Sequence, residues 1–259
     1  MLNIVQSQLK RLHLANIIDT LPSRITQGHK DALSHIEWLQ LLLQDEIEHR
    51  DKQSLERRLQ RACFEHDQTL LGYELGHYSP NIQRLISELR TGDYLTNHNH
   101  VLIFGPTGTG KTHLAQGLGH QACLQGHEVR FIRSSKLMEE LSITRAIDSG
   151  SCQRLKKYTK PQLLIIDDFG LHALSIEQAN DLYEMVVEKE KKSSFIITSN
   201  KPIESWVELF PDPVLANAVL DRLAHAAYHL ILEGESYRRK LAIGLQCPIN
   251  PKASNNQIL

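Results

Sequence analysis

The sequence predicts an α/β fold, in which a parallel sheet lies between layers of helices. A glycine-rich segment at residues 105–112 follows a short apolar run and precedes a helical pattern. A second apolar run ends in two carboxylates, Asp167 and Asp168. Further short apolar runs alternate with segments that begin in helix-capping residues. Strands and helices that alternate in this way are typical of α/β folds.

Length and charge limit the possibilities. The chain has 259 residues, of which 41% are apolar, so it can form one large α/β domain with a small additional domain. Its formal net charge is −1, so any contact with a polyanion must come from local patches. The four cysteines form no C-x-x-C pair, and neither a signal peptide nor a long apolar span is found. We therefore expect a cytoplasmic protein with reduced cysteines and no membrane contact.

The N-terminal part of the chain predicts a small helical domain over residues 1–75. Apolar residues recur there at helical spacing, and Pro22 and Gly28 are expected to interrupt the pattern. Ser34 and Glu37 then form a capping box, which predicts the start of a long helix. We expect this domain to contact DNA or a partner protein.

Four arginines of the long helix are spaced so that they share one face: Arg50, Arg57, Arg58 and Arg61. One hypothesis is a ridge that contacts the phosphates of DNA. The alternative is a solvated face whose arginines pair with nearby acids, namely Glu46, Glu56 and Glu65. The sequence leaves both open.

The second domain is expected over residues 76–245, followed by a disordered tail at 246–259. It opens with a helix that Ser79 caps and Pro80 starts. Apolar runs predict five strands, at residues 101–104, 128–132, 163–168, 195–200 and 228–232. The helices between them are expected to follow three capping positions: Ser134, Ser175 and Asp212.

The segment at 105–112 fits the phosphate-binding pattern G-x-x-x-x-G-K-[ST]. Its residues are Gly105, Pro106, Thr107, Gly108, Thr109, Gly110, Lys111 and Thr112. The glycines allow a tight turn that brings backbone N–H groups up to phosphate oxygens. Lys111 places a charge on the β- and γ-phosphates, and the Thr112 hydroxyl is a ligand for Mg²⁺. The strand before this loop and the helix after it are the context that the motif requires.

Asp167 and Asp168 end a buried strand at the edge where α/β sheets bind ligands. We expect Asp167 to hold Mg²⁺, mostly through water, and Asp168 to polarise an attacking water. Asn200 ends the fourth strand and could bind the γ-phosphate or the water, although asparagine is also common in turns. Arg222 is either an arginine finger for the nucleotide of a neighbouring subunit or one partner of a local salt bridge.

A basic cluster at residues 152–160 holds four cations without an acid: Arg154, Lys156, Lys157 and Lys160. Tyr158 lies within the cluster. Unopposed cations beside an aromatic ring favour contact with a nucleic-acid backbone. The alternative is an ordinary exposed helix whose lysines extend into solvent.

Together these segments resemble the AAA+ ATPases of the initiator and helicase-loader clade, and within it the IstB-type ATP-binding helpers of insertion sequences. The resemblance covers nearly the whole chain. Its narrowest motifs are Asp212-Pro213, Leu220-Asp221-Arg222-Leu223 and Gly234-Glu235-Ser236.

The resemblance implies a five-stranded parallel sheet, with ATP and Mg²⁺ bound at the interface between subunits of an ATP-dependent homo-oligomer. It implies binding to DNA, with duplex favoured, near residues 135–160, and cooperation with a transposase. A replicative helicase loader of the DnaC kind is the alternative, because the ATPase core is nearly the same and only the N-terminal region differs.

The resemblance also implies roles for single residues. The two carboxylates form the Walker B pair, Asn200 corresponds to sensor 1, and Arg222 to the arginine finger. Too few residues follow the fifth strand to build a full lid domain, so Arg238 or Arg239 would replace the lid arginine. Asp168 stands where glutamate is commoner, and its shorter side chain predicts slow hydrolysis that DNA or a partner regulates.

Overall fold

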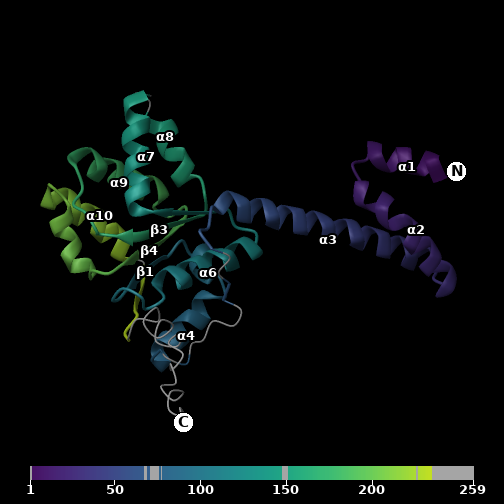
Figure 1. The fold of residues 1–259 in the computed structure, drawn as a ribbon, viewed down its shortest axis with the longest axis horizontal. Helices are drawn as coiled ribbons and strands as arrows, with labels where there is room; N and C mark the ends of the chain where they lie inside the picture. Colours follow the sequence, from purple (N-terminus) through teal and green to yellow (C-terminus); the bar gives the residue numbers. More distant parts are fainter. Residues whose placement is uncertain are drawn as a thin grey trace, which may run out of the picture. The chain divides into compact units, whose positions relative to one another are not determined.

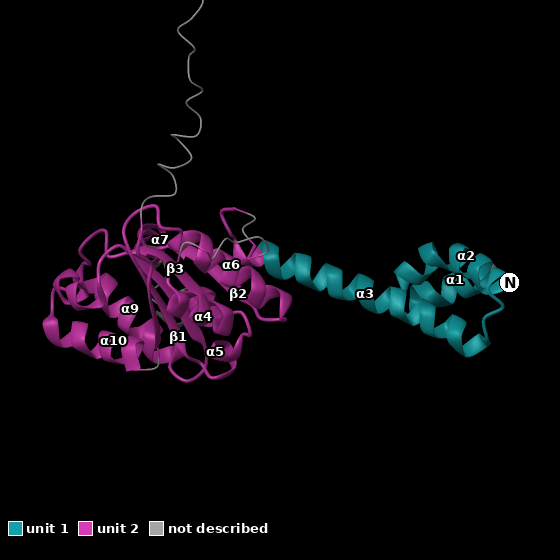
Figure 2. Cartoon of the chain, turned by 90° about the horizontal axis from the view of Figure 1, so that it is seen from below, with its two compact units in different colours: residues 1–60 teal, residues 61–259 magenta. Residues whose placement is uncertain are grey.

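The computed structural model describes residues 2–66, 69–70, 76, 78–147, 151–225 and 227–234. The chain forms two compact units, residues 1–60 and residues 61–259 (Figure 2). The division falls inside one helix, α3 (His35–Ala62). The predicted domain boundary at residue 75 and the tail at 246–259 lie outside the described residues.

The first unit is helical. Its elements are α1 (Leu2–Arg11), α2 (Ala15–Lys30) and the first part of α3. The capping box that predicted the start of α3 is present: the Ser34 N–H donates to Oε2 of Glu37 at 2.8 Å, and the Glu37 N–H donates to Oγ of Ser34 at 3.3 Å. Ile17 and Leu21 of α2 pack with Leu42 of α3 in a small core.

The expectation that Pro22 and Gly28 interrupt the helix was wrong. Both lie inside α2, and the break falls earlier, at residues 12–14. Burial of the α2 apolar face against Leu42 outweighs the one hydrogen bond that Pro22 cannot donate. At Gly28, an added Cβ would lie 2.9 Å from Cδ1 of Trp38, so glycine lets the two helices approach closely.

The second unit contains the sheet. Its helices are α4 (Pro80–Leu89), α5 (Asp93–Thr96), α6 (Lys111–Leu124), α7 (Ser134–Ile147), α8 (Ser151–Thr159), α9 (Ile176–Lys189), the 3₁₀ helix η1 (Ile203–Leu209) and α10 (Pro213–His225). Its strands are β1 (His100–Phe104), β2 (Val129–Arg133), β3 (Leu163–Phe169), β4 (Ser194–Ser199) and β5 (Ala227–Ile231). All strand pairs are parallel, in the order β2-β3-β4-β1-β5, which confirms the predicted five-stranded parallel sheet.

Helices cover both faces of the sheet, with α4 and α6 on one side and α7 to α10 on the other (Figure 1). The alternation of side chains along each strand assigns them to the two layers. Leu102, Ile166 and Ile197 join the core formed with α7 to α10. Ile165 points to the opposite face, where an added Cβ at Gly119 of α6 would meet its side chain at 2.6 Å.

Three of the helix caps predicted for the second unit are present, at Ser79, Ser175 and Asp212, whereas Ser134, expected to cap a helix, is instead the first residue of α7. Oγ of Ser79 accepts a hydrogen bond from the Ile82 N–H, and Pro80 is the first residue of α4. Ser175 forms a complete capping box at α9. Oδ1 of Asp212 accepts from the Val214 N–H at 2.8 Å, at the start of α10. Each cap satisfies a backbone donor that the first helical turn leaves unpaired.

Because all five strands run in the same direction, the sheet has two chemically different edges. We call the edge where the strands end the carboxyl edge; Gly105, Asp168 and Asn200 lie there. We call the opposite edge, where the strands begin, the amino edge. His100, the first residue of β1, and Ser194, the first residue of β4, lie there.

Candidate functional site

The phosphate loop lies at the carboxyl edge, between β1 and α6. Gly108 and Gly110 adopt φ values of 89°, in the left-handed region that glycine enters at no steric cost. Nζ of Lys111 donates to the carbonyl oxygens of Gly105 and Pro106, at 2.8 and 2.9 Å. The lysine therefore lies within the turn of the loop, where its charge and the backbone N–H groups act on the same anion.

Asp167 connects three elements at the carboxyl edge. Oγ1 of Thr112, in α6, lies 3.0 Å from both carboxylate oxygens of Asp167, in β3. Oγ1 of Thr198, in β4, donates to Oδ1 of Asp167 at 2.6 Å. The structure thus brings together the two predicted metal ligands, although 55 residues separate them in the chain.

Thr198 is a site residue to which sequence analysis gave no role. Besides its bond to Asp167, its Oγ1 accepts a hydrogen bond from the Asp168 N–H at 2.9 Å. β4 lies between β3 and β1, so its end fills the space between the carboxylates and the phosphate loop. The signal was a hydroxyl residue near the end of an otherwise apolar buried strand.

Asp168 and Asn200 flank this cluster. The register of β3 shifts between Ile166 and Phe169, and Asp168 has φ of 56°, a left-handed conformation that is uncommon for a residue other than glycine. Asn200 is exposed and follows Ser199, whose carbonyl accepts from the Gly105 N–H at 3.3 Å. Both residues therefore lie at the same edge as the phosphate loop.

The donor set fits a nucleotide with Mg²⁺. Burial raises the pKa of Asp167, because desolvation disfavours the carboxylate, while the hydrogen bond from Thr198 acts in the opposite direction. A cation next to Asp167 would restore the charged form. One carboxylate and one hydroxyl are the oxygen ligands that Mg²⁺ takes beside phosphates.

A pocket of about 530 Å³ lies next to the phosphate loop. Its lining comes from the start of α4 and the end of β5: Tyr78, Ser79, Asn81, Ile82, Ile231, Glu233 and Gly234. The Tyr78 hydroxyl donates to the carbonyl oxygen of Thr109 at 2.8 Å and so joins the pocket to the loop. The pocket has no local signature in the sequence, because its two walls are about 150 residues apart in the chain.

Arg222 lies at the amino edge. α10 ends at His225, and β5 then begins at Ala227, which pairs with His100 at the start of β1. The phosphate loop follows the other end of β1, a five-residue strand. A strand of that length spans about 16 Å at ~3.3 Å per residue, so Arg222 is remote from the loop of its own chain.

The Arg222 side chain has three contacts within its own subunit, and one of them is the local salt bridge that the sequence left open. Its Nη1 donates to the Ala218 carbonyl at 2.7 Å, and its guanidinium lies 5.6 Å from the Tyr183 ring centre. Its Nε lies 3.3 Å from the Glu190 carboxylate but without hydrogen-bond geometry. It lines a pocket of about 550 Å³ with Asn97, His98, His100, Glu190, Lys191, Asp221 and His225.

The arginines of α3 have partners within the chain. Nε of Arg50 pairs with Glu46 at 2.7 Å, and its Nη2 donates to the His13 carbonyl. Arg57 donates to the Gln53 carbonyl, and Arg58 to Oγ of Ser54. The Glu46 pairing follows the solvated-face alternative, whereas Glu65, expected to pair within this helix, instead binds an arginine of β2, Arg133.

Arg61 lies in the second unit. Its Nη1 is 3.3 Å from a carboxylate oxygen of Glu128, and its carbonyl accepts a hydrogen bond from Arg130. This arginine thus also has an acidic partner, in the segment that leads into β2.

The residues of the basic cluster at 152–160 differ in their contacts. Lys157 pairs with Glu140 at 2.5 Å. Tyr158 is buried and its hydroxyl donates to Glu140, so its ring is not available for contact with a nucleic-acid backbone. Helical spacing explains the burial, because Leu155 and Tyr158 share the face that packs on the core. The side chain of Arg154 lies outside the described part of the chain.

Two further predictions from the sequence concern the lid arginine and contact with a membrane. Arg238 and Arg239 lie outside the described residues. In the part of the chain that the structure describes, no helix combines the length and the apolar character needed to span a bilayer.

Comparisons with known proteins agree with this site. A family model described as "IstB-like ATP binding protein" matches residues 7–243. An insertion-sequence ATP-binding protein of Mycobacterium tuberculosis is 36% identical over 235 residues, covering 90% of this chain and 93% of that protein. An IS21 ATP-binding protein of Pseudomonas aeruginosa is 34% identical over 241 residues, covering 92% and 89%.

Solved structures agree in fold. A DnaC helicase loader matches with a TM-score of 0.54 at 21% identity, covering 64% of this chain and 97% of that one. AMPPCP-bound DnaA from Aquifex aeolicus matches with a TM-score of 0.55 at 18% identity, covering 69% and 54%. This chain therefore shares its fold with these two proteins.

Proposed function

The chain belongs to the IstB-like ATP-binding protein family, and from this premise we propose that it is an ATPase that assembles on DNA and recruits or stimulates a transposase. One observation carries the proposal. The groups suited to hold ATP lie at the carboxyl edge, whereas Arg222 lies at the amino edge. A subunit built in this way needs a neighbour to complete its site.

Within one chain, Lys111 and the loop N–H groups bind the phosphates, and Thr112 with Asp167 holds Mg²⁺. The bound cation would offset charge on the phosphate oxygens. Asp168 and Asn200 orient the attacking water. Because the aspartate side chain is short, intrinsic hydrolysis is slow and increases when DNA or a partner closes the site.

Between chains, Arg222 of one subunit approaches the γ-phosphate held by the next. ATP then acts as the switch for assembly, because the guanidinium gains a charge-assisted contact only when the γ-phosphate is present. Hydrolysis removes that contact and weakens the interface. The position of Arg222 at the amino edge, remote from the phosphate loop of its own chain, supports this role.

The names of the relatives support the assignment of DNA and transposase as partners, because these proteins occur in insertion sequences. The decisive experiment measures binding to duplex and single-stranded DNA, with and without ATP and Mg²⁺, while particle size is recorded. Large ATP-dependent complexes on duplex, to which the transposase binds, are expected.

Other outcomes would contradict the proposal. A preference for single strands, or assembly only with a replicative helicase, would indicate a loader, as the fold of the DnaC match allows. Absence of DNA binding in every nucleotide state would leave an ATP-binding protein of another function.

A further inference from the structure

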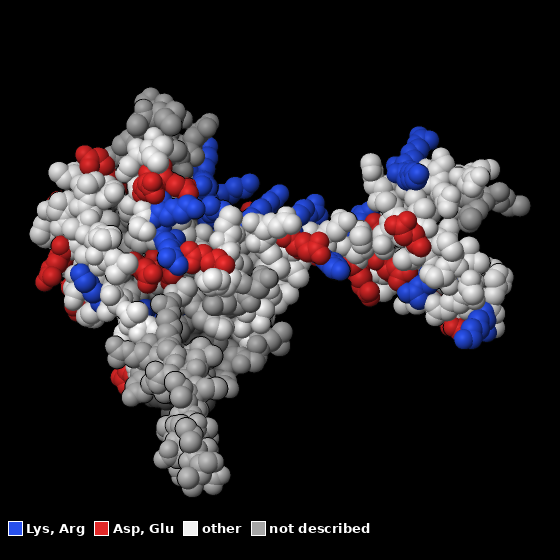
Figure 3. All heavy atoms as spheres, viewed as in Figure 1, with Lys and Arg blue, Asp and Glu red and all other residues white. Residues whose placement is uncertain are grey.

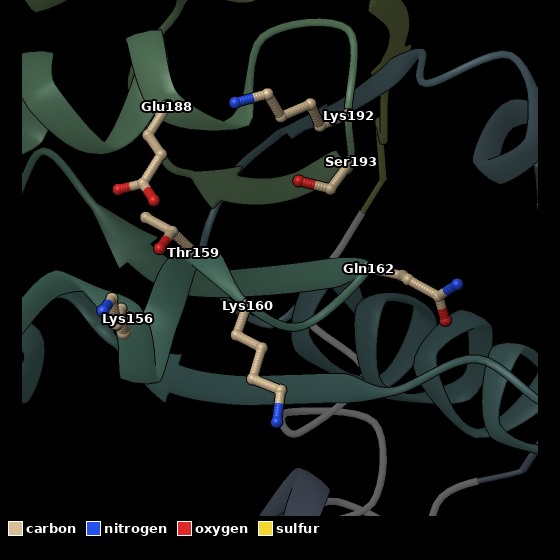
Figure 4. A pocket seen from close by; sticks show the side chains of 7 residues that line it. All are labelled: Lys156, Thr159, Lys160, Gln162, Glu188, Lys192 and Ser193. Carbon is tan, nitrogen blue, oxygen red and sulfur yellow. The ribbon is translucent and has the colours of Figure 1, made fainter. Parts of the chain in front are cut away.

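A second polar hollow lies at the amino edge, remote from the phosphate loop. It has a volume of about 400 Å³ and lies where the end of α8, the end of α9 and the start of β4 meet. Its lining residues are Lys156, Thr159, Lys160, Gln162, Glu188, Lys192 and Ser193 (Figure 4). We call it the lysine hollow.

Three of these side chains are lysines: Lys156, Lys160 and Lys192. Within the described residues, Lys156, Lys160 and Lys192 form no ion pair or side-chain hydrogen bond, although Glu188 lies in the same hollow. Their neighbours behave differently, since Lys157 pairs with Glu140 and Lys189 donates to the Pro161 carbonyl. Three cations against one carboxylate leave the hollow positively charged.

Ser193 provides a second and independent observation. Its side chain is 5% exposed, and its Oγ has no hydrogen-bond partner among the described residues. Buried hydroxyl groups are normally paired, because an unpaired one loses its bonds to water without replacement. In Figure 4 its hydroxyl points into the space near Thr159 and Glu188. An acceptor that enters the hollow would satisfy it.

The directions of the lysines indicate the shape of the ligand. The ammonium groups of Lys160 and Lys192 point to opposite sides of the hollow in the close view (Figure 4). A nucleic-acid strand presents phosphates at intervals of about 3.4 Å along the helix axis, so different phosphates can meet lysines that point in different directions. A chain of phosphates therefore fits the arrangement better than a single anion.

The charged surface of the second unit supports a local site. On the face shown in Figure 3, acidic side chains lie beside basic ones over much of the second unit. With a net charge of −1, contact with a polyanion depends on places where cations lack acidic neighbours.

We propose that the lysine hollow binds the sugar–phosphate backbone of DNA, with Lys156, Lys160 and Lys192 contacting successive phosphates and Ser193 donating to a phosphate oxygen between them. The inference rests on the proposed function, because it names the surface through which the ATPase contacts its DNA. It also separates the cations of α8 into those that contact DNA and Lys157, which does not.

The test is lysine footprinting of the full chain by acetylation and mass spectrometry, with ATP and Mg²⁺, alone and with duplex DNA. DNA should reduce modification of Lys156, Lys160 and Lys192 at least threefold and leave Lys157 unchanged. Equal protection of Lys157, or no protection of the other three, would overturn the site. Fluorescence anisotropy on the same samples shows whether DNA is bound at all, so that failure of the site and failure of the proposed function are distinguished.

Two further experiments use inorganic phosphate in place of DNA and single lysine variants. Inorganic phosphate, used as a single-anion probe, should not protect the three lysines; protection equal to that by DNA would overturn the proposal in favour of a site for a single anion. Lys160→Gln and Lys192→Gln should each reduce the slope of log affinity against log salt by about 1. Lys157→Gln is the matched control, since it also removes one lysine charge, here from the last turn of α8, and an equal change in its slope would contradict the proposal.

Discussion

The two edges of the sheet differ in how completely their polar groups are satisfied. At the carboxyl edge, Asp167 is buried but accepts hydrogen bonds from Thr112 and Thr198. At the amino edge, the Ser193 hydroxyl and Nδ1 of His98 are buried without a partner among the described residues. One edge is therefore organised before any ligand binds, whereas the other has groups that a second molecule would satisfy.

The largest effect should come from Arg222→Ala, which removes the amino-edge contribution alone. ATP binding by the isolated subunit should change less than twofold, while ATP hydrolysis by the assembled protein should fall about 10³-fold, as for other arginine fingers. Steady-state turnover and nucleotide titration measure the two quantities. If hydrolysis and assembly both survive, the division of the site between two subunits is wrong.

Lys111→Ala removes the charge of the carboxyl edge. The affinity for ATP should fall about 100-fold, which corresponds to ~2.7 kcal/mol, and assembly should be lost with it. Titration with a fluorescent ATP analogue measures the change, and a circular dichroism spectrum like that of the unmodified protein shows that the fold is retained. Unchanged affinity would contradict the assignment of the phosphate loop.

The pH dependence of the free energy of unfolding tests the burial of Lys189 at the amino edge. This side chain is fully buried, and burial lowers its pKa to about 7, although Glu188 acts in the opposite direction and His100 lies nearby. Above pH 7 the folded protein has lost this proton while the unfolded chain keeps it up to about 10.5, so the free energy of unfolding should rise with pH between these values.

The comparison is with Lys189→Met, which keeps the volume and removes the charge. The unmodified protein should gain up to about 1.4 kcal/mol per pH unit relative to this variant between pH 7 and 10. Urea denaturation at several pH values measures it. A constant difference between the two proteins across this range would show that Lys189 is not neutral in the folded state.

Thr198→Val tests the internal bonds of the carboxyl edge and should have the smallest effect. It keeps the shape but removes the hydroxyl that binds Asp167 and the Asp168 N–H. Hydrolysis should fall about 10-fold, because leaving a buried hydrogen-bonding group without its partner costs roughly 1–3 kcal/mol. The affinity for ATP should stay nearly unchanged. Thr198→Ser, which keeps the hydroxyl, should retain most activity, and equal loss in both variants would contradict the role.

Local patterns were sufficient to predict most elements. The capping boxes at Ser34 and Ser175 and the apolar runs identified helices and strands, because these signals depend on residues a few positions apart. Pro22 was misjudged because tertiary packing of α2 outweighs a local preference. The apolar runs also predicted five strands, and the resemblance implied that all of them run parallel.

Contacts between distant segments were not predictable from the sequence. The placement of β4 between β3 and β1 determines that Thr198 meets Asp167, and no short pattern specifies the order of strands. The same holds for Glu140, which binds Lys157 and removes it from the basic cluster. The phosphate loop and its carboxylates were found because their chemistry requires fixed residue types.

The distance between Arg222 and the phosphate loop of its own chain has a consequence for mixed assemblies. A subunit that lacks Lys111 still has Arg222 at its amino edge, and a subunit that lacks Arg222 still has the phosphate loop at its carboxyl edge. When the two are neighbours, they would together form one complete site. In a random equal mixture, about one junction in four would combine both functional edges. Each variant alone would then be inactive, whereas their mixture would hydrolyse ATP. Two differently defective copies of such a protein in one cell would likewise form active sites together.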